Sequence, residues 1–116
     1  MATKQQVERK LLELIMRLDG ADGKVHGSLA DTLGEPKVIE VEVPDLGSSY
    51  WTELSGGRMG PLQQGSPPQA DIRIRVDSDH LVELVDGHKS LFSSYIAGSV
   101  KIEASLTDLL RLRKLA

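Results

Sequence analysis

The chain of 116 residues contains no cysteine. This absence excludes disulfide bonds, thiolate metal sites and cysteine nucleophiles, and it is compatible with a reducing cytosol. Aromatic residues make up only 3% of the chain, and Trp51 is the single tryptophan. Because proteins that bind single-stranded nucleic acids stack the bases on several aromatic rings, one tryptophan does not make such a platform.

Basic charge is not in excess, and long apolar runs are missing. The formal net charge of −3 argues against non-specific nucleic-acid binding, which depends on a positive field that meets the phosphates. No apolar run approaches the roughly 20 residues that a membrane-spanning helix needs. Residues 1–6 lack the order of charged, apolar and small residues that defines a signal peptide. We therefore expect a soluble, cytoplasmic protein that binds no nucleic acid and does not insert stably into a membrane.

The sequence offers no catalytic or metal-binding constellation. The three histidines, His26, His80 and His88, lack a paired spacing and have no cysteine partners, so we interpret them as exposed residues that bind no metal. The carboxylates of Asp77 and Asp79 are better explained by helix capping than by acid–base catalysis. No serine lies in a nucleophile-elbow pattern. We expect no enzymatic activity, no metal and no cofactor.

The first 36 residues are expected to be mainly helical. Apolar residues recur at helical spacing over about three turns, at Val7, Leu11, Leu14, Ile15 and Leu18. The segment 19–23, which contains two glycines, ends this helix. A second short helix is permitted over 24–34, although Gly27 weakens it.

The middle of the chain is expected to form strands joined by turns. In the first strand, apolar and acidic residues alternate strictly, so one face is apolar and the other is charged. The pair Gly56-Gly57 can adopt the backbone of a tight hairpin between the next two strands. The expected strands are residues 37–43, 49–55 and 58–63, and the expected turn and loop are residues 44–47 and 65–69.

The last third of the chain combines two strands with three helices, and almost every apolar residue in it points to one side. The expected strands are residues 71–76 and 98–104, and the expected helices are about residues 79–87, 90–98 and 105–116. Their expected capping residues are Asp77 or Ser78, Ser90, and Ser105, with Asp108 approximating a capping box.

The charged face of the predicted sheet carries both signs. Opposite charges on neighbouring strands would each contribute about 0.2 to 1 kcal/mol, which explains this face better than a nucleic-acid platform does. The residues concerned are Arg73, Arg75 and Lys101 with Glu40, Glu42 and Glu103.

The order of residues from 70 to 115 carries a further pattern. It runs from Ala70-Asp71 through the alternating strand to Asp77-Ser78-Asp79, Leu81, Leu84 and Gly87, then to Tyr95-Ile96-Ala97-Gly98-Ser99-Val100-Lys101-Ile102 and a leucine-rich terminal helix. This pattern resembles the sterol carrier protein type 2 family, and the hairpins over 38–62 fit that family's strands more loosely.

The resemblance implies an α+β fold with a five-stranded, mostly antiparallel sheet and helices packed on one face. We expect a single domain over residues 1–116, in which 1–36 form a helical amino-terminal segment and 37–116 form the sheet and its covering helices. Members of this family hold sterols, fatty acids or acyl-CoA in an apolar tunnel between the two layers, and they need neither a metal nor an organic cofactor. The resemblance thus implies non-enzymatic binding or transfer of a lipid.

Carried onto this sequence, the tunnel is lined by apolar residues of the last third. Tyr95 would be the polar handle in this wall, since a buried phenol usually seeks a partner. The implied lining residues are Leu81, Leu84, Val85, Phe92, Tyr95, Ile96, Val100, Ile102, Leu106, Leu109 and Leu110. The alternative is a structural or protein-interaction module with a tunnel filled by side chains, acting as a homodimer or as an accessory subunit of an enzyme.

Overall fold

The computed structural model describes residues 1–19, 36–55 and 58–115. The elements are α1 (Lys4–Asp19), β1 (Lys37–Val43), the 3-10 helix η1 (Pro44–Leu46), β2 (Ser48–Ser55), β3 (Arg58–Met59), β4 (Gln63–Gln64), β5 (Ile72–Val76), α3 (Ser78–Val85), α4 (Leu91–Ala97), β6 (Val100–Glu103) and α5 (Leu106–Leu115). The helix expected over 24–34 and the hairpin at Gly56-Gly57 lie outside the described residues.

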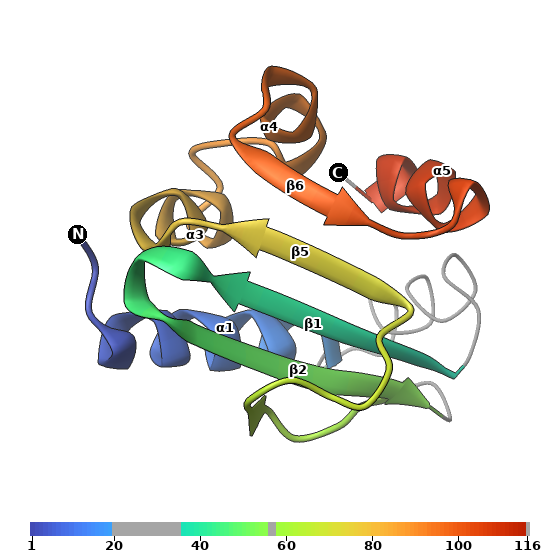
Figure 1. Ribbon diagram of the computed structural model, residues 1–116, viewed down its shortest axis with the longest axis horizontal. Coiled ribbons are helices and arrows are strands. Elements are labelled where there is room, and N and C mark those ends of the chain that lie inside the picture. The colour runs from blue at the N-terminus through green and yellow to red at the C-terminus, as the bar shows by residue number, and fades with distance from the viewer. Residues whose placement is uncertain (20–35, 56–57, 116) are drawn as a thin grey trace.

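The described strands form one mixed sheet in the order β3-β2-β1-β5-β6, and β4 pairs with β2 as well. The pair β1–β5 is parallel, and every other pair among these strands is antiparallel. Helices α1 and α3 pack against each other on one face of the sheet, behind the strands in Figure 1. Helix α4 packs against β6, and α5 follows that strand directly. The expected α+β fold with a mostly antiparallel sheet is confirmed.

The single strand expected over 58–63 was wrong, because the structure divides it into β3 and β4. Between them, the Gly60 amide donates a hydrogen bond to the Glu53 carbonyl oxygen at 2.8 Å. A Cβ at Gly60 would lie 3.3 Å from that oxygen, so the close approach favours glycine. Pro61 follows and has no amide to donate to a sheet ladder, which interrupts the pairing with β2.

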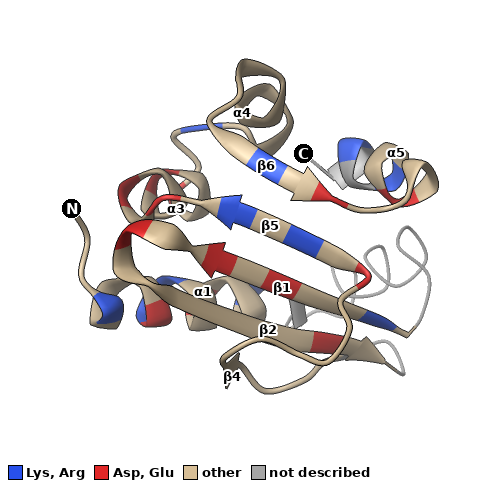
Figure 2. Ribbon diagram, in the orientation of Figure 1, with Lys and Arg blue, Asp and Glu red and all other residues tan. Residues whose placement is uncertain are grey.

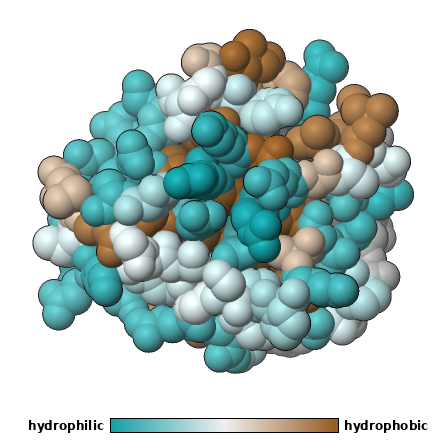
Figure 3. All heavy atoms as spheres, in the orientation of Figure 1, coloured by the Kyte–Doolittle hydropathy of each residue, from teal (hydrophilic) through white to brown (hydrophobic). Residues whose placement is uncertain are grey.

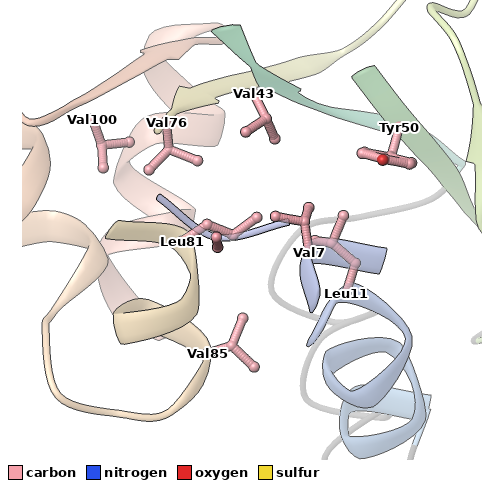
Figure 4. Close-up of a cluster of buried hydrophobic side chains, with 9 residues drawn as sticks. Val7, Leu11, Val43, Tyr50, Val76, Leu81, Val85 and Val100 are labelled. Atoms are coloured by element: carbon pink, nitrogen blue, oxygen red, sulfur yellow. The ribbon is translucent and has the colours of Figure 1, made fainter. Parts of the chain in front are cut away.

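The apolar side of the sheet, where α1 and α3 lie, carries the larger of two hydrophobic clusters, which we call the α1–α3 core. In Figure 4, valines of three strands point toward side chains of α1 and α3. Alternation along each strand explains this arrangement, since every second residue faces the helices. The buried members are Ala2, Val7, Leu11, Val43, Tyr50, Val76, Leu81, Val85 and Val100.

A second cluster contains two completely buried residues, Leu54 of β2 and Ile72 of β5. Partly buried apolar residues pack against this pair, namely Ile39, Met59, Ile74, Ile102 and Ala104. Ala104 belongs to the connection from β6 to α5, so the carboxyl-terminal helix begins beside this cluster. We refer to it below as the second cluster.

The opposite face of the sheet is charged, as Figure 2 shows along β1, β5 and β6. The sequence predicts a solvated face here, and this was wrong for Glu40, whose side chain is 2% exposed. Its carboxylate accepts hydrogen bonds from Arg73 Nε at 2.6 Å and from Ser66 Oγ at 2.8 Å. Ser66 lies in the connection from β4 to β5, which passes in front of the sheet in Figure 1. This connection therefore supplies one of the two hydrogen-bond donors that satisfy the buried Glu40 carboxylate.

The helix caps were predicted correctly in part. Ser90 Oγ accepts a hydrogen bond from the Ser93 amide, and Ser105 Oγ accepts one from the Asp108 amide, as expected. Asp77 occupies the N-cap position of α3 but makes no side-chain capping bond. The capping box expected at Asp108 was wrong as well, because that carboxylate bonds instead to Lys37.

The cap of α3 comes from a residue that is distant in the sequence. The Ser78 amide donates to Asp45 Oδ1 at 2.9 Å, and Ser78 Oγ donates to Asp45 Oδ2 at 2.6 Å. Burial alone would raise the pKa of Asp45, but the hydrogen bonds from the Ser78 side chain and backbone outweigh it and lower the pKa. The Asp45 carboxylate, which lies in η1, therefore caps the amino-terminal end of α3 while it is ionised.

Replacing this cap is expected to destabilise the fold. We expect Asp45→Ala to lower the free energy of unfolding by about 1 kcal/mol, the usual cost of removing a helix cap. Asp77→Ala is the matched control and is expected to change it by less than about 0.5 kcal/mol. Because the pKa of Asp45 is lowered in the folded state, its contribution is present above pH 3.8 and is lost as the pH falls below that value. Urea unfolding at neutral and acidic pH measures both effects, and equal losses for the two variants would contradict this assignment.

Candidate functional site

The eleven residues implied by the family resemblance fall into groups with very different environments. Leu81 and Val85 of α3 and Val100 of β6 are buried members of the α1–α3 core. Leu84 packs against this core from outside, and Ile102 packs against both clusters. The residues of this first group thus lie within the two hydrophobic clusters or pack against them.

A second group lies half-buried on α4 and α5. The rings of Phe92 and Tyr95 have centroids 6.2 Å apart and planes inclined by 44°. The Arg113 guanidinium lies 5.4 Å from the centroid of the Phe92 ring, a cation–π contact that joins α5 to α4. Leu109, also half-buried, completes this group.

The third group is exposed to solvent. The exposed fractions are 71% for Ile96, 73% for Leu106 and 54% for Leu110. In Figure 3, strongly hydrophobic residues gather over the regions that α4 and α5 occupy in Figure 1. We call these three residues the α4–α5 apolar surface. Large apolar side chains that remain in water are favourable places for a partner or ligand to cover.

Polar contacts join α1 to the carboxyl-terminal end of α3. Lys10 Nζ lies 2.6 Å from Asp86 Oδ1, and Arg17 donates to the Val85 carbonyl oxygen at 3.0 Å. The side-chain hydrogen bond raises the pKa of Lys10 and lowers the pKa of Asp86. The pair therefore stabilises the fold fully between pH 3.8 and pH 10.5 and loses its contribution outside that range.

Helix α4 is linked to α3 through a histidine. His80 Nε2 lies 2.7 Å from the Oγ atom of Ser94, which is buried. The expectation that His80 is exposed was wrong, because this bond draws the ring partly into the interface, whereas His88 is exposed. His26 lies outside the described residues. Among the described residues, no group of three or more His, Cys, Asp and Glu side chains could hold a metal ion.

A polar pair lies beside the second cluster. Lys37 Nζ and Asp108 Oδ2 are 3.0 Å apart, and the Asp108 side chain is only 4% exposed. Sequence reasoning missed this pair, although one signal was present. Lys37 has the same parity along β1 as Ile39 and Val41, which places it on the apolar face of the sheet.

A surface depression of about 540 Å³ lies near the beginning of α3. Its lining is mainly charged, so it does not suit an apolar ligand. The lining residues are Met1, Asp45, Asp77, Asp79, His80, Glu83 and Lys89. In the described parts of the chain, no helix has the length and apolar character needed to cross a membrane.

Comparison with protein families decides the classification. A model of the SCP-2 sterol transfer family matches residues 5–116. The chain belongs to this family. The match confirms the resemblance carried by residues 70–115 and extends it over α1. No curated protein matches the sequence.

Solved structures share the fold at low sequence identity. The sterol carrier protein 2 of Yarrowia lipolytica, in its apo form, is 17% identical with a TM-score of 0.65, and the match covers 96% of this chain and 98% of that one. A structure named UbiJ-SCP2 ubiquinone synthesis protein is 18% identical with a TM-score of 0.66, and 99% of this chain and 92% of that one are covered. These likenesses support the family's fold.

One similar structure belongs to a much longer protein. It is the inverting sec-alkylsulfatase Pisa1 from Pseudomonas sp., which is 18% identical with a TM-score of 0.65. The match covers 90% of this chain but only 15% of the sulfatase. The SCP-2 fold therefore also occurs as a small part of an enzyme chain.

Proposed function

We propose that this protein binds or transfers a lipid, namely a sterol, a fatty acid or an acyl-CoA, between its sheet and its helices. The observation that carries the proposal is the α4–α5 apolar surface, formed by Ile96, Leu106 and Leu110 in a member of the SCP-2 sterol transfer family. The mechanism is burial rather than catalysis. Each methylene moved out of water contributes about 0.8 kcal/mol, so an acyl chain of about ten methylenes gains about 8 kcal/mol before the costs of association.

The three environments of the lining residues give each group a separate role. Leu81, Val85 and Val100 form the fixed wall, because all three are buried members of the α1–α3 core. The half-buried residues of α4 and α5 contact the body of the ligand, among them Tyr95 as the polar handle. The exposed residues of the α4–α5 apolar surface line the entrance, and movement of α4 and α5 away from the sheet admits the ligand.

The contacts of α5 support this gating role. Polar and cation–π contacts join this helix to the rest of the protein, among them Arg113 with the Phe92 ring and Asp108 with Lys37. Contacts of this kind can separate and form again without disturbing the buried α1–α3 core. Opening would expose the half-buried apolar residues of α4 and α5 to an entering lipid.

Native mass spectrometry of the gently purified protein, followed by lipid extraction and titration with a fluorescent fatty acid or sterol, tests the proposed function. We expect a bound lipid or saturable binding. Covering one leucine contributes about 1.5 kcal/mol, so the double variant Leu106→Asn and Leu110→Asn is expected to weaken binding about tenfold or more. The matched control is Leu12→Asn with Met16→Asn, which alters two exposed apolar residues of α1. If both double variants bind lipid with equal affinity, the α4–α5 apolar surface is not part of the binding site.

We also infer a second candidate function, that of a protein-interaction module. Leu12 and Met16 lie four residues apart on α1, with exposed fractions of 48% and 75%, and thus form an apolar strip away from the core. The similarity to a structure named as a ubiquinone synthesis protein and to part of a sulfatase chain is consistent with an accessory role beside an enzyme. A protein that is purified free of lipid and binds none in the titration would favour this second function.

A further inference from the structure

We propose that the Lys37–Asp108 pair selects lipids whose polar end is a hydroxyl group. This inference rests on the proposed function, because it names the ligand class of the same site. Asp108 Oδ2 is occupied by Lys37 Nζ at 3.0 Å, but within the described residues Asp108 Oδ1 has no hydrogen-bond donor. Arg111 Nη1 lies 3.7 Å from Oδ1, which is an ionic contact but too long for a hydrogen bond.

An acceptor in this state is unusual in a folded protein. Buried polar atoms nearly always have a partner, and an exception calls for an explanation such as a bound water or a ligand. The Asp108 side chain is 4% exposed, so bulk water does not solvate its free oxygen. In the unfolded chain, water donates a hydrogen bond to this oxygen. A ligand donor that reaches Asp108 Oδ1 would therefore replace the bond that is lost on folding.

The surroundings of the pair point to a lipid as the source of that donor. Lys37 lies opposite Leu54 in the pairing of β1 with β2, and Leu54 is a completely buried member of the second cluster. Ala104, another member, precedes α5 by one residue. A polar pair at the end of an apolar cluster matches a molecule with a long apolar body and one polar end.

The chemistry of the pair distinguishes among polar ends. A hydroxyl group can donate its proton to Asp108 Oδ1 and can accept a hydrogen bond from the Lys37 ammonium. An ionised carboxylate has no proton to donate, and it would place a second negative charge beside Asp108. Lys37 and Arg111 would attract such a carboxylate, but neither supplies the donor that Oδ1 lacks. We therefore infer that the pair favours a lipid with a terminal hydroxyl group, such as a long-chain alcohol, over one with an ionised carboxylate.

Three ligands with the same chain test the inference in the wild-type protein at mildly alkaline pH. They are 1-hexadecanol, its methyl ether 1-methoxyhexadecane, which lacks the donor, and palmitate, which is ionised. We expect 1-hexadecanol to bind about three- to tenfold more tightly than the other two, as the gain of one hydrogen bond allows. Binding of the ether or of palmitate as tightly as the alcohol would overturn the inference, because the free oxygen would then need no donor from the ligand.

The variant Asp108→Asn provides the second measurement. Its amide can donate where the carboxylate only accepts, so the difference between the alcohol and the ether is expected to disappear and palmitate is expected to gain affinity. An unchanged preference for the alcohol in a folded Asp108→Asn protein would also overturn the inference. If that variant does not fold, the three ligands on the wild type decide alone. Failure of the wild type to bind any lipid would instead contradict the proposed function.

Discussion

Truncation of Leu81 to alanine is expected to lower the free energy of unfolding by about 3 kcal/mol, whereas the same truncation at Leu106 is expected to change it by less than about 0.5 kcal/mol. The two residues are both helical leucines, and both are implied tunnel residues. Leu81 is 5% exposed within the α1–α3 core, and Leu106 is 73% exposed. Only the truncation of Leu81 leaves a cavity among packed side chains. Urea unfolding followed by circular dichroism measures both free energies.

The same pair of variants separates stability from lipid binding. Leu106→Ala is expected to keep the wild-type stability but to bind lipid more weakly, because the leucine would contact the ligand rather than the core. A loss of more than about 2 kcal/mol at Leu106 would mean that α5 is packed against other protein, and this would contradict its role at the entrance. A small loss at Leu81 would show that the α1–α3 core adjusts to a cavity more easily than its burial indicates.

Removal of the buried carboxylate of Glu40 is the other change with a large expected effect. We expect Glu40→Ala to lower the free energy of unfolding by about 2 kcal/mol, since it removes the hydrogen bonds from Arg73 and Ser66 and leaves a cavity under the β4–β5 connection. The matched control is Glu42→Ala in the same strand. Its partner Arg75 lies 3.9 Å away and both side chains are accessible to solvent, so a loss below about 1 kcal/mol is expected.

The order of two further variants tests the physical reason. Arg73→Met is expected to destabilise the protein more than Glu40→Met, because it leaves a buried carboxylate without its cation. In Glu40→Met, the Arg73 side chain, which is already 38% exposed, can turn toward water. The reverse order, measured by urea unfolding, would show that the carboxylate reaches solvent in the variant and that Ser66 does not shield it.

Local patterns in the sequence were sufficient for most of the secondary structure. Strand β1 was predicted over the residues that it occupies, and α1 was predicted from a stripe of apolar residues. The caps at Ser90 and Ser105 were also predicted correctly. These features depend on contacts within a few residues, where backbone geometry relates the sequence directly to the structure.

The polar contacts that connect distant segments were not predicted. Asp45 caps α3 from 33 residues away, and Lys37 meets Asp108 from 71 residues away. Glu40 has the alternation of a solvent-facing residue, but in the fold it is buried and accepts hydrogen bonds from Ser66 and Arg73. The order of residues in one strand carries no information about which loop will cover that strand.

The sequence by itself determined which side of each strand and helix is apolar, and its resemblance to a known family anticipated the SCP-2 fold. It did not distinguish Leu81 from Leu106, because both occupy apolar positions of amphipathic helices. Tertiary structure alone decided that Leu81 is buried in the α1–α3 core while Leu106 remains in water. It also decided that Asp108 is buried with one oxygen that has no donor among the described residues. The physical reason is that periodicity is a local property of the backbone, whereas burial depends on segments that only folding brings together.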